Sequence, residues 1–386
     1  MAAVEATESA DMAPPPLEAN KVELPEEEEE VELFNGIPNY KPGHKFGDKF
    51  VIEERIGFDD RFGATYFVTP QKSDRPLELV LRLDNTLIHT PSVLLVEIAL
   101  LRKANEHRKH NLFAQLHDHG CFETDYYWYT TYFKGGPTLR QITEFMSSSR
   151  GSAKLSYSTV GRFGYNLYQI LGFMHSCNFI LCSLDQDMFH FDAASRTLFL
   201  ADLSTVRPKP KSKTDVRWSG NLNYTPLGWS DQIQNPIPAD TLANLELEAV
   251  FYLILELTMG ELPWGRDHTD QVAQKKISNF NSNSQYLKHL PETYHTLWNN
   301  IMDIVSSPGA YSDIQPILGL CKQIYEKHGH CKSWDDDFDF ERQPTPEELP
   351  RFVMEKVPAE GEAVQEPGKS AQQVQEDIEN EGQGVT

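Results

Sequence analysis

The segment Leu245–Met259 constrains the fold more than any other part of the chain, because it is apolar on nearly every face of a helix. A helix that is apolar all round is buried within protein, whereas a surface helix keeps one polar face. Gly260 follows directly and is a typical stop signal at a helix C-terminus. The chain therefore contains a sizeable helical unit that encloses this segment.

Apolar residues at helical spacing predict further helices in the same part of the chain. They cover residues 158–176, 269–280, 292–305 and 312–328. Strand-like runs come earlier, at residues 49–57, 64–68, 77–83, 113–119 and 126–133. One helix interrupts them, with Thr90 as its cap and Glu97 in its middle. We expect an α+β protein with a small β-rich lobe at about 45–134 and a larger, mostly helical lobe at about 135–341.

The two ends of the chain differ from this middle part in composition. Residues 1–46 hold 11 acidic and 3 basic residues, and residues 342–386 hold 10 acidic and 4 basic ones. Such segments bury too little apolar surface to fold. We expect residues 1–44 and 342–386 to be disordered. The net charge of −22 argues against binding to nucleic acid or to an anionic membrane.

Cysteine usage and hydropathy indicate where the protein resides. The cysteines are Cys121, Cys177, Cys182, Cys321 and Cys331. Their number is odd and none forms a C-x-x-C pair, which is typical of a reduced intracellular protein. No apolar run is long enough to cross a bilayer, and the first residues lack the features of a signal peptide. We expect a cytoplasmic protein, and a nuclear location stays open.

The stretch Phe179–Arg207 carries the candidate site. Two short apolar runs, Phe179–Leu181 and Thr197–Ala201, flank a polar loop. The second run ends at Asp202, and an acid at the end of a buried strand is a natural position for a metal ligand. Catalytic loops are often found between such short strands, so we expect the chemistry of the protein here.

The order of elements and several motifs resemble the protein kinase fold over residues 45–341. Within that fold the chain resembles the casein kinase 1 superfamily, and specifically its tau-tubulin kinase branch. The motifs that carry this resemblance are Gly220-Asn221-Leu222-Asn223-Tyr224-Thr225-Pro226, Gly260-Glu261-Leu262-Pro263-Trp264, Tyr286-Leu287-Lys288-His289-Leu290-Pro291 and Asp337-Phe338-Asp339-Phe340-Glu341. The resemblance implies a cleft between the lobes, where Ser/Thr kinases bind ATP and Mg²⁺.

The same resemblance implies that most of the catalytic groups are missing. Ser183 stands at the position of the catalytic base, Met188 at that of a metal-binding Asn, and Asp185 at that of a Lys. A hydroxyl cannot take up a proton as a carboxylate does, and hard Mg²⁺ avoids a thioether. Asp202 alone retains the family position of a metal ligand.

The positions that would hold the nucleotide are altered as well. Of the glycine-rich loop only Gly57 and Gly63 remain, and two carboxylates between them would repel a triphosphate. Arg82 replaces the phosphate-binding Lys, while its helix partner survives as Glu97. A guanidinium does not reproduce the point charge of an ammonium, so we expect this pair to serve the architecture of the lobe.

Three further substitutions preserve packing where chemistry is lost. Leu181 and Leu203 replace the His and Phe that stack between the lobes in the family, and both replacements are apolar. Glu246 replaces the buried Asp that organises the catalytic loop, which keeps a carboxylate there. This pattern favours a fold that is kept while its reaction is discarded.

Two other clusters are candidate binding sites. Five basic residues occupy the activation-loop position, namely Arg207, Lys209, Lys211, Lys213 and Arg217. Casein kinases use basic residues in this region to recognise acidic or phosphorylated substrates, so this basic cluster could bind a phosphopeptide or the acidic ends of the chain itself. A solvated loop is the plainer alternative. His107, His110, His117 and His119 have no cysteine beside them, and we do not expect a metal site there.

We therefore expect a pseudokinase that interacts with proteins and transfers no phosphate effectively. No cofactor is firmly implied, and ATP and Mg²⁺ would bind weakly. Two alternatives stay open. One is a weak Ser/Thr kinase in which Asp185 or Asp187 serves as the base, and the other is a nucleotide-binding switch that does no chemistry.

Overall fold

The computed structural model describes residues 20–21, 32–34, 36–56, 63–72, 77–88, 92–122, 127–133, 135–210, 218–230, 239–265, 269–280, 287–307, 313–329 and 332–341. The chain divides into two compact units, Met1–Phe352 and Val353–Thr386. All described residues lie in the first unit, which contains both predicted lobes.

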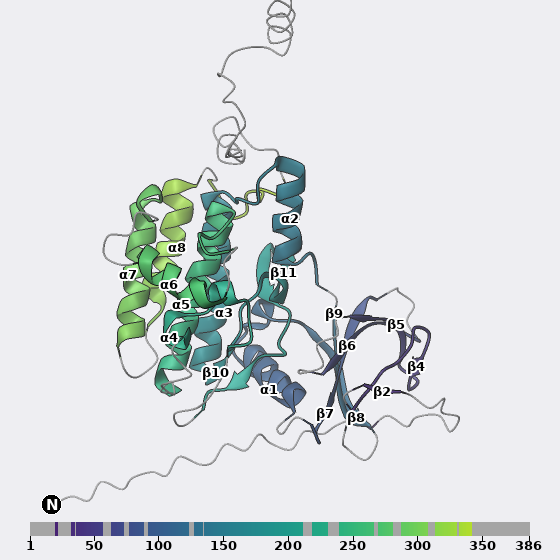
Figure 1. Ribbon diagram of the computed structural model, residues 1–386. Coiled ribbons are helices and arrows are strands. Elements are labelled where there is room, and N and C mark those ends of the chain that lie inside the picture. Colours follow the sequence, from purple (N-terminus) through teal and green to yellow (C-terminus); the bar gives the residue numbers. More distant parts are fainter. Residues whose placement is uncertain are drawn as a thin grey trace, which may run out of the picture. The chain divides into compact units, whose positions relative to one another are not determined.

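The smaller lobe is built on one sheet with the strand order β1-β8-β9-β7-β6-β5-β4 (Figure 1). Its strands are β1 (Asn20–Lys21), β4 (Lys45–Phe46), β5 (Phe50–Ile56), β6 (Ala64–Pro70), β7 (Leu79–Asn85), β8 (Leu116–Phe122) and β9 (Tyr127–Phe133). Neighbouring strands are antiparallel except β1 and β8, which pair in parallel. Alternate residues of β6 point into the core of the lobe, as expected for a sheet with one buried face.

Packing begins earlier in the chain than the predicted boundary at residue 45. A hairpin of β2 (Leu33–Phe34) and β3 (Ile37–Pro38) precedes the sheet, and Ile37 and Tyr40 are buried. The hydroxyl of Tyr66 donates to the Pro38 carbonyl at 2.6 Å and fastens this segment to β6. Residues 36–44 therefore belong to the smaller lobe.

The single helix of this lobe is α1 (Val93–Glu106), followed by the short helix η1 (His110–Leu112). Thr90 and Pro91, the predicted start, lie outside the described residues. Asp84, at the end of β7, accepts hydrogen bonds from the Ser92 hydroxyl and from the Val93 N–H. A carboxylate at this end complements the positive end of the helix dipole, so β7 fixes where α1 begins.

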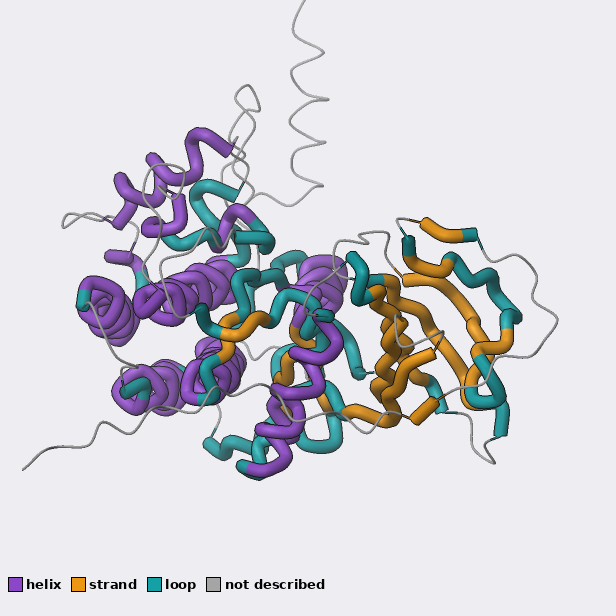
Figure 2. The backbone as a smooth tube through the Cα atoms, turned by 90° about the horizontal axis from the view of Figure 1, so that it is seen from below, coloured by secondary structure: helices purple, strands orange, loops and turns teal. Residues whose placement is uncertain are grey.

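The larger lobe is helical, and Figure 2 shows its helices gathered apart from the strands of the smaller lobe. Its helices are α2 (Leu139–Arg150), α3 (Tyr157–Ser176), α4 (Leu227–Ser230), α5 (Ala239–Met259), α6 (Thr269–Phe280), α7 (Glu292–Ser306) and α8 (Gln315–His328), with short turns η2 (Gln186–Met188), η3 (Leu222–Tyr224) and η4 (Leu287–His289). The buried helix is confirmed as α5, and it begins earlier than the apolar pattern indicated. Gly260 ends it with a φ of 82°, a conformation that costs glycine little.

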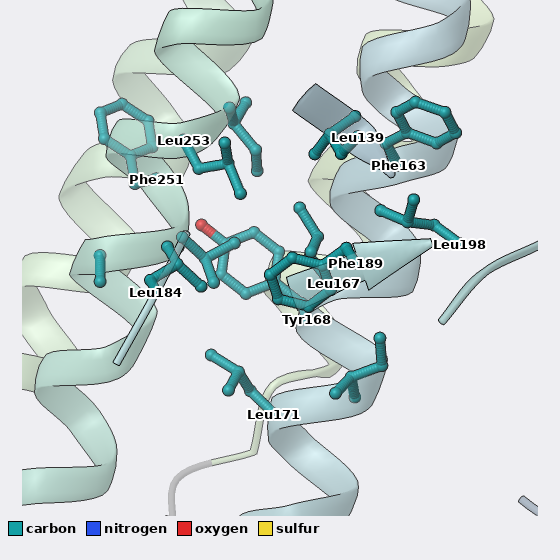
Figure 3. Packing of buried hydrophobic residues seen from close by; sticks show 14 of the residues in the cluster. Leu139, Phe163, Leu167, Tyr168, Leu171, Leu184, Phe189, Leu198, Phe251 and Leu253 are labelled. Carbon is teal, nitrogen blue, oxygen red and sulfur yellow. The ribbon is translucent and has the colours of Figure 1, made fainter. Parts of the chain in front are cut away.

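The core of this lobe forms where α5 meets α3. Figure 3 shows Phe163, Leu167 and Tyr168 of α3 with Phe251 and Leu253 of α5. All of them belong to one buried cluster, which also contains residues of α1 from the smaller lobe. The two lobes therefore share a continuous apolar core.

Two small sheets frame the candidate site. β10 (Phe179–Ile180) pairs with β13 (Arg207–Pro208), and β11 (Phe189–Asp192) pairs with β12 (Thr197–Leu200). Both predicted apolar runs thus contain strands, but these two strands do not pair with each other. Strand β11 lies in the stretch that the sequence indicated to be a loop, because its apolar residues are too few to show a pattern.

The last described residues close the larger lobe. Arg162 of α3 is buried and lies 3.6 Å from the ring centre of Phe338. Its guanidinium donates to the carbonyl oxygens of Trp334 and Asp336 at 2.9 and 2.5 Å. Asp339 accepts the N–H of Ser156, the residue that caps α3, at 2.6 Å. The Asp337–Glu341 motif is therefore part of the folded lobe.

Candidate functional site

The cation and carboxylate predicted to pair across the smaller lobe do so. Arg82 of β7 and Glu97 of α1 are both buried and form an ion pair. Tyr132 of β9 donates its hydroxyl to Glu97 at 2.6 Å, which satisfies the second carboxylate oxygen. Burial alone would lower the pKa of Arg82, but Glu97 and Asp202 raise it, so the guanidinium stays charged.

Asp202 lies beside this pair, at the end of β12. Its Oδ1 is 4.0 Å from a guanidinium nitrogen of Arg82, and its side chain is 46% exposed. It also accepts the N–H of Ser204 at 2.9 Å, an interaction that fixes the carboxylate at the start of the following loop. Arg82, Glu97 and Asp202 therefore lie together in space.

Glu246 of α5 holds the loop that follows β10. Its Oε1 accepts the backbone N–H groups of Leu181 and Cys182, each at 2.7 Å. His175 contacts its other oxygen at 2.8 Å. Cys182 has a φ of 56°, which is unusual and strained for a residue with a side chain. Its N–H is one of the two that Glu246 accepts.

Ser183, which the resemblance assigns to the position of the base, is covered by another part of the chain. The N–H of Ser219 donates to the Cys182 carbonyl, and that of Asn221 donates to the Leu184 carbonyl, both at 3.0 Å. Between them, Gly220 is so close that a Cβ atom on it would lie 2.2 Å from the Leu184 nitrogen and 2.9 Å from the Ser183 hydroxyl. Ser183 is consequently only 5% exposed. Sequence reasoning missed this cover, because nothing local links residues 182–184 to residues 219–221.

Met188 lies in the apolar core and not in a polar site. Its side chain is 4% exposed and belongs to the same buried cluster as Leu181 and Leu203. Its backbone carbonyl accepts the N–H groups of Ala201 and Asp202 at 2.8 and 3.2 Å. Met188 therefore contributes packing through its side chain and positions Asp202 through its backbone carbonyl.

Arg140 of α2 binds both carboxylates of the polar loop. Its Nη2 donates to Asp185 and its Nε donates to Asp187, each at 2.5 Å. Partial burial opposes the charge, yet the hydrogen bonds to Asp187 and Asp185 raise the pKa of Arg140. The sequence gives no signal for this residue, which stands 45 positions before Asp185.

The connection between the lobes packs directly on the strands beneath it. A Cβ atom on Gly135 would lie 2.7 Å from the ring of His190 and 2.9 Å from Phe199. The Gly136 carbonyl lies 2.9 Å from Nδ1 of His190, and the Pro137 carbonyl accepts the N–H of Phe191 at 2.9 Å. Burial lowers the pKa of His190. The protein's own side chains therefore occupy the space under this connection.

The remaining predicted residues are only partly described. Gly57, Lys211, Lys213 and Arg217 lie outside the described residues. Gly63 has a φ of 93°, and a Cβ atom on it would lie 2.3 Å from the Leu83 carbonyl, so strand packing alone requires glycine there. The guanidinium of Arg207 donates to the carbonyls of Ser204 and Val206 at 2.8 and 2.7 Å. The basic cluster as a whole stays a prediction.

Within the part of the chain that the structure describes, no group of three or more His, Cys, Asp or Glu residues is placed to hold a metal ion. None of the helices among these described residues has the length and hydropathy needed to span a membrane.

Comparison with known proteins identifies the architecture. No family model matches the chain. A solved structure described as "Structure of vaccinia related kinase 3" is similar, with a TM-score of 0.52 and 15% sequence identity over 75% of this chain and 91% of that one. At that identity the likeness concerns the fold. This α+β chain, with its strand-rich first lobe and helical second lobe, has the protein kinase fold.

Proposed function

We propose that this protein is a pseudokinase of the casein kinase 1 superfamily, of the tau-tubulin kinase type, which works by binding other proteins. The observation that carries the proposal is the covered position of Ser183, which is buried beneath the backbone of Ser219–Asn221. A substrate hydroxyl must come within hydrogen-bond distance of the group that takes its proton. Neither the hydroxyl of Ser183 nor its surroundings meet that requirement.

The metal-binding side of the cleft supports the same function. Phosphoryl transfer depends mostly on positioning and on electrostatic stabilisation by metal ions and cations. Met188 offers a buried thioether where a kinase needs an oxygen ligand, so Asp202 is the one carboxylate left at the two family positions for the metal. A single carboxylate with half its surface in water is a weak site for Mg²⁺.

Arg140 counts against the alternative of a weak Ser/Thr kinase. That alternative needs Asp185 or Asp187 as the base, and both carboxylates accept hydrogen bonds from the Arg140 guanidinium. These ion pairs, at 2.5 Å each, use one oxygen of each carboxylate to hold the polar loop on α2, so both groups already have a structural role.

One observation favours the second alternative, a nucleotide-binding switch. Arg82, Glu97 and Asp202 keep the arrangement in which Arg82 would contact phosphate oxygens and Asp202 a metal ion. His190 and Phe199 oppose it, because they fill the space under the connection between the lobes. The residues present therefore fit a nucleotide only in part.

The partners that we propose are acidic or phosphorylated proteins, recognised by the basic cluster. The backbone N–H of Lys209 donates to the Asn178 carbonyl at 2.7 Å. This hydrogen bond fixes the start of the basic cluster on the larger lobe. Replacing Lys209, Lys211 and Lys213 together by Ala should abolish capture of a phosphoserine peptide, while Lys288→Ala on η4 should not. Equal capture by both variants would remove this part of the proposal.

The test of the pseudokinase itself uses the purified full chain with radiolabelled ATP, Mg²⁺ and casein. We expect no transfer, and no rise in melting temperature with ATP and Mg²⁺, since a ligand that binds the native state raises its stability. A rise without transfer would favour the switch. Metal-dependent transfer that disappears in Asp202→Asn would overturn the proposal.

A further inference from the structure

A recess of about 360 Å³ lies between the end of α1 and the start of β8. Leu101, Ala104 and Ala114 are buried and form its apolar floor. The side chains at its rim are polar and exposed, and they belong to Asn105, His110 and Gln115. Its volume is at the lower end of the range for ligand pockets, which is about 300–1,000 Å³. The recess therefore combines an apolar floor with a polar edge.

The rim of the recess can form new hydrogen bonds. None of its three polar side chains forms a hydrogen bond with another described residue. Other polar side chains of the smaller lobe are paired, such as Lys49, which donates to Asp118 and to Tyr129 at 2.7 and 2.8 Å. Amides and an imidazole can both donate to and accept from a ligand. A ligand at this rim therefore breaks no hydrogen bond within the described part of the protein.

The surface beside the recess is basic in an acidic protein. Residues 102–110 contain four basic residues and one acidic residue, a net charge of +3, whereas the whole chain carries −22. Lys103 forms an ion pair with Glu106 at 3.3 Å. Lys103 is also the basic residue in the last turn of α1, where a cation complements the helix dipole. The cations that remain beyond these local roles are Arg102, Arg108 and Lys109.

These three cations adjoin the recess and form no ion pair with a carboxylate in the described part of the chain. Arg102 stands one helical turn before Asn105 of the rim, and Lys109 directly precedes His110. Burial, and next the charge of Arg102, lower the pKa of His119 on β8, so the guanidinium lies toward that strand. An anionic group at the rim would therefore meet cations that no described carboxylate already neutralises.

We propose that this recess docks an acidic segment of a partner protein. One apolar side chain of the segment enters between α1 and β8, and carboxylates beside it pair with Arg102, Arg108 and Lys109. Charge complementarity selects this occupant, because a chain of net charge −22 disfavours the approach of an acidic segment elsewhere. The inference rests on the proposed function, a protein that works by binding other proteins, and adds a second contact site on the smaller lobe.

Fluorescence anisotropy with the purified full chain tests the chemistry of the occupant. The probe is a labelled peptide, Glu-Glu-Phe-Glu-Glu, and its controls are Glu-Glu-Ala-Glu-Glu and Lys-Lys-Phe-Lys-Lys. We expect saturable binding of the probe and no preference for the basic control. The Ala control should bind more weakly by roughly ten- to a hundredfold, since one buried apolar side chain is lost. Failure of the probe to bind, or equal binding of the probe and the Ala control, would overturn the proposal.

Substitutions of exposed residues test the location. Arg102→Glu combined with Lys109→Glu should weaken binding of the probe by at least roughly tenfold, because two attractions become repulsions. The matched control combines Lys288→Glu on η4 with Lys327→Glu on α8, which are exposed and change the net charge equally. At physiological ionic strength distant charges are screened, so the control should weaken binding by less than about twofold. Equal effects of the two double variants would contradict the location.

Two further outcomes separate this recess from other binding sites. Loss of probe binding when Lys209, Lys211 and Lys213 are replaced by Ala, with binding retained in the Arg102 and Lys109 double variant, would place the peptide on the basic cluster. That result would overturn this inference and leave the proposed function intact. Dimerisation of the full chain that the same double variant abolishes would assign the recess to a second copy, and it would overturn the inference as well.

Discussion

Replacing Glu246 should separate the role of its carboxylate from its size. Glu246 is buried, and its Oε1 accepts two backbone N–H groups, those of Leu181 and Cys182. Glu246→Leu leaves both N–H groups buried without this acceptor, at about 1–3 kcal/mol each. We therefore expect the free energy of unfolding to fall by about 2–6 kcal/mol, since each orphaned donor adds its own cost.

Glu246→Gln is the matched control, because a glutamine keeps one carbonyl oxygen for both N–H groups. It loses the charge and changes the contact with His175, which should cost no more than about 1–2 kcal/mol. Urea denaturation followed by tryptophan fluorescence gives the unfolding free energy of each variant. The reasoning is refuted if the Leu and Gln variants agree within about 0.5 kcal/mol, the scatter of neutral substitutions.

Three further outcomes are expected. Phe338→Ala should lower the unfolding free energy by about 3–5 kcal/mol, because the ring is buried against Arg162. The control Phe145→Ala, at a side chain that is 51% exposed, should change it by less than about 0.5 kcal/mol. Equal effects of the two substitutions in urea denaturation would contradict the packing of Phe338. Burial lowers the pKa of Lys276 to about 7. Above that pH the unfolded chain binds more protons than the folded chain, so the free energy of unfolding rises with pH. Relative to Lys276→Met, the wild type should gain about 2 kcal/mol between pH 7 and 9, and parallel stability curves would contradict this. Ser183→Asp should gain no phosphoryl transfer in the radiolabelled ATP assay, because the new carboxylate lies beneath Gly220, and measurable transfer would disprove the cover.

Patterns confined to one element predicted the architecture well. The all-round apolar face of Leu245–Met259 and the Gly260 stop depend on neighbours in the sequence, and both are present in the structure as α5 and its end. The Arg82–Glu97 pair was predicted by resemblance, because a strand and the helix after it keep their facing positions when the fold is kept.

Contacts between distant segments could not be predicted in this way. The cover over Ser183 depends on how the segment after the basic cluster folds back, and Arg140 reaches Asp185 and Asp187 only because α2 starts beside η2. A single arginine or glycine in the sequence carries no sign of such a partner. The start of the smaller lobe was placed too late for a similar reason, since Ile37 and Tyr40 are too few to form a pattern.

The seating of Arg162 has a consequence for synthesis on the ribosome. Its guanidinium is buried against the carbonyls of Trp334 and Asp336 and the ring of Phe338, which are translated long after α3 itself. A nascent chain that ends before these residues lacks all three contacts of this guanidinium, and Phe163 and Phe191 lack the ring of Phe338 that packs on them. The larger lobe can therefore finish folding only after residues 334–341 have been synthesised. A translation product truncated before them should be degraded by proteases more readily than the full chain.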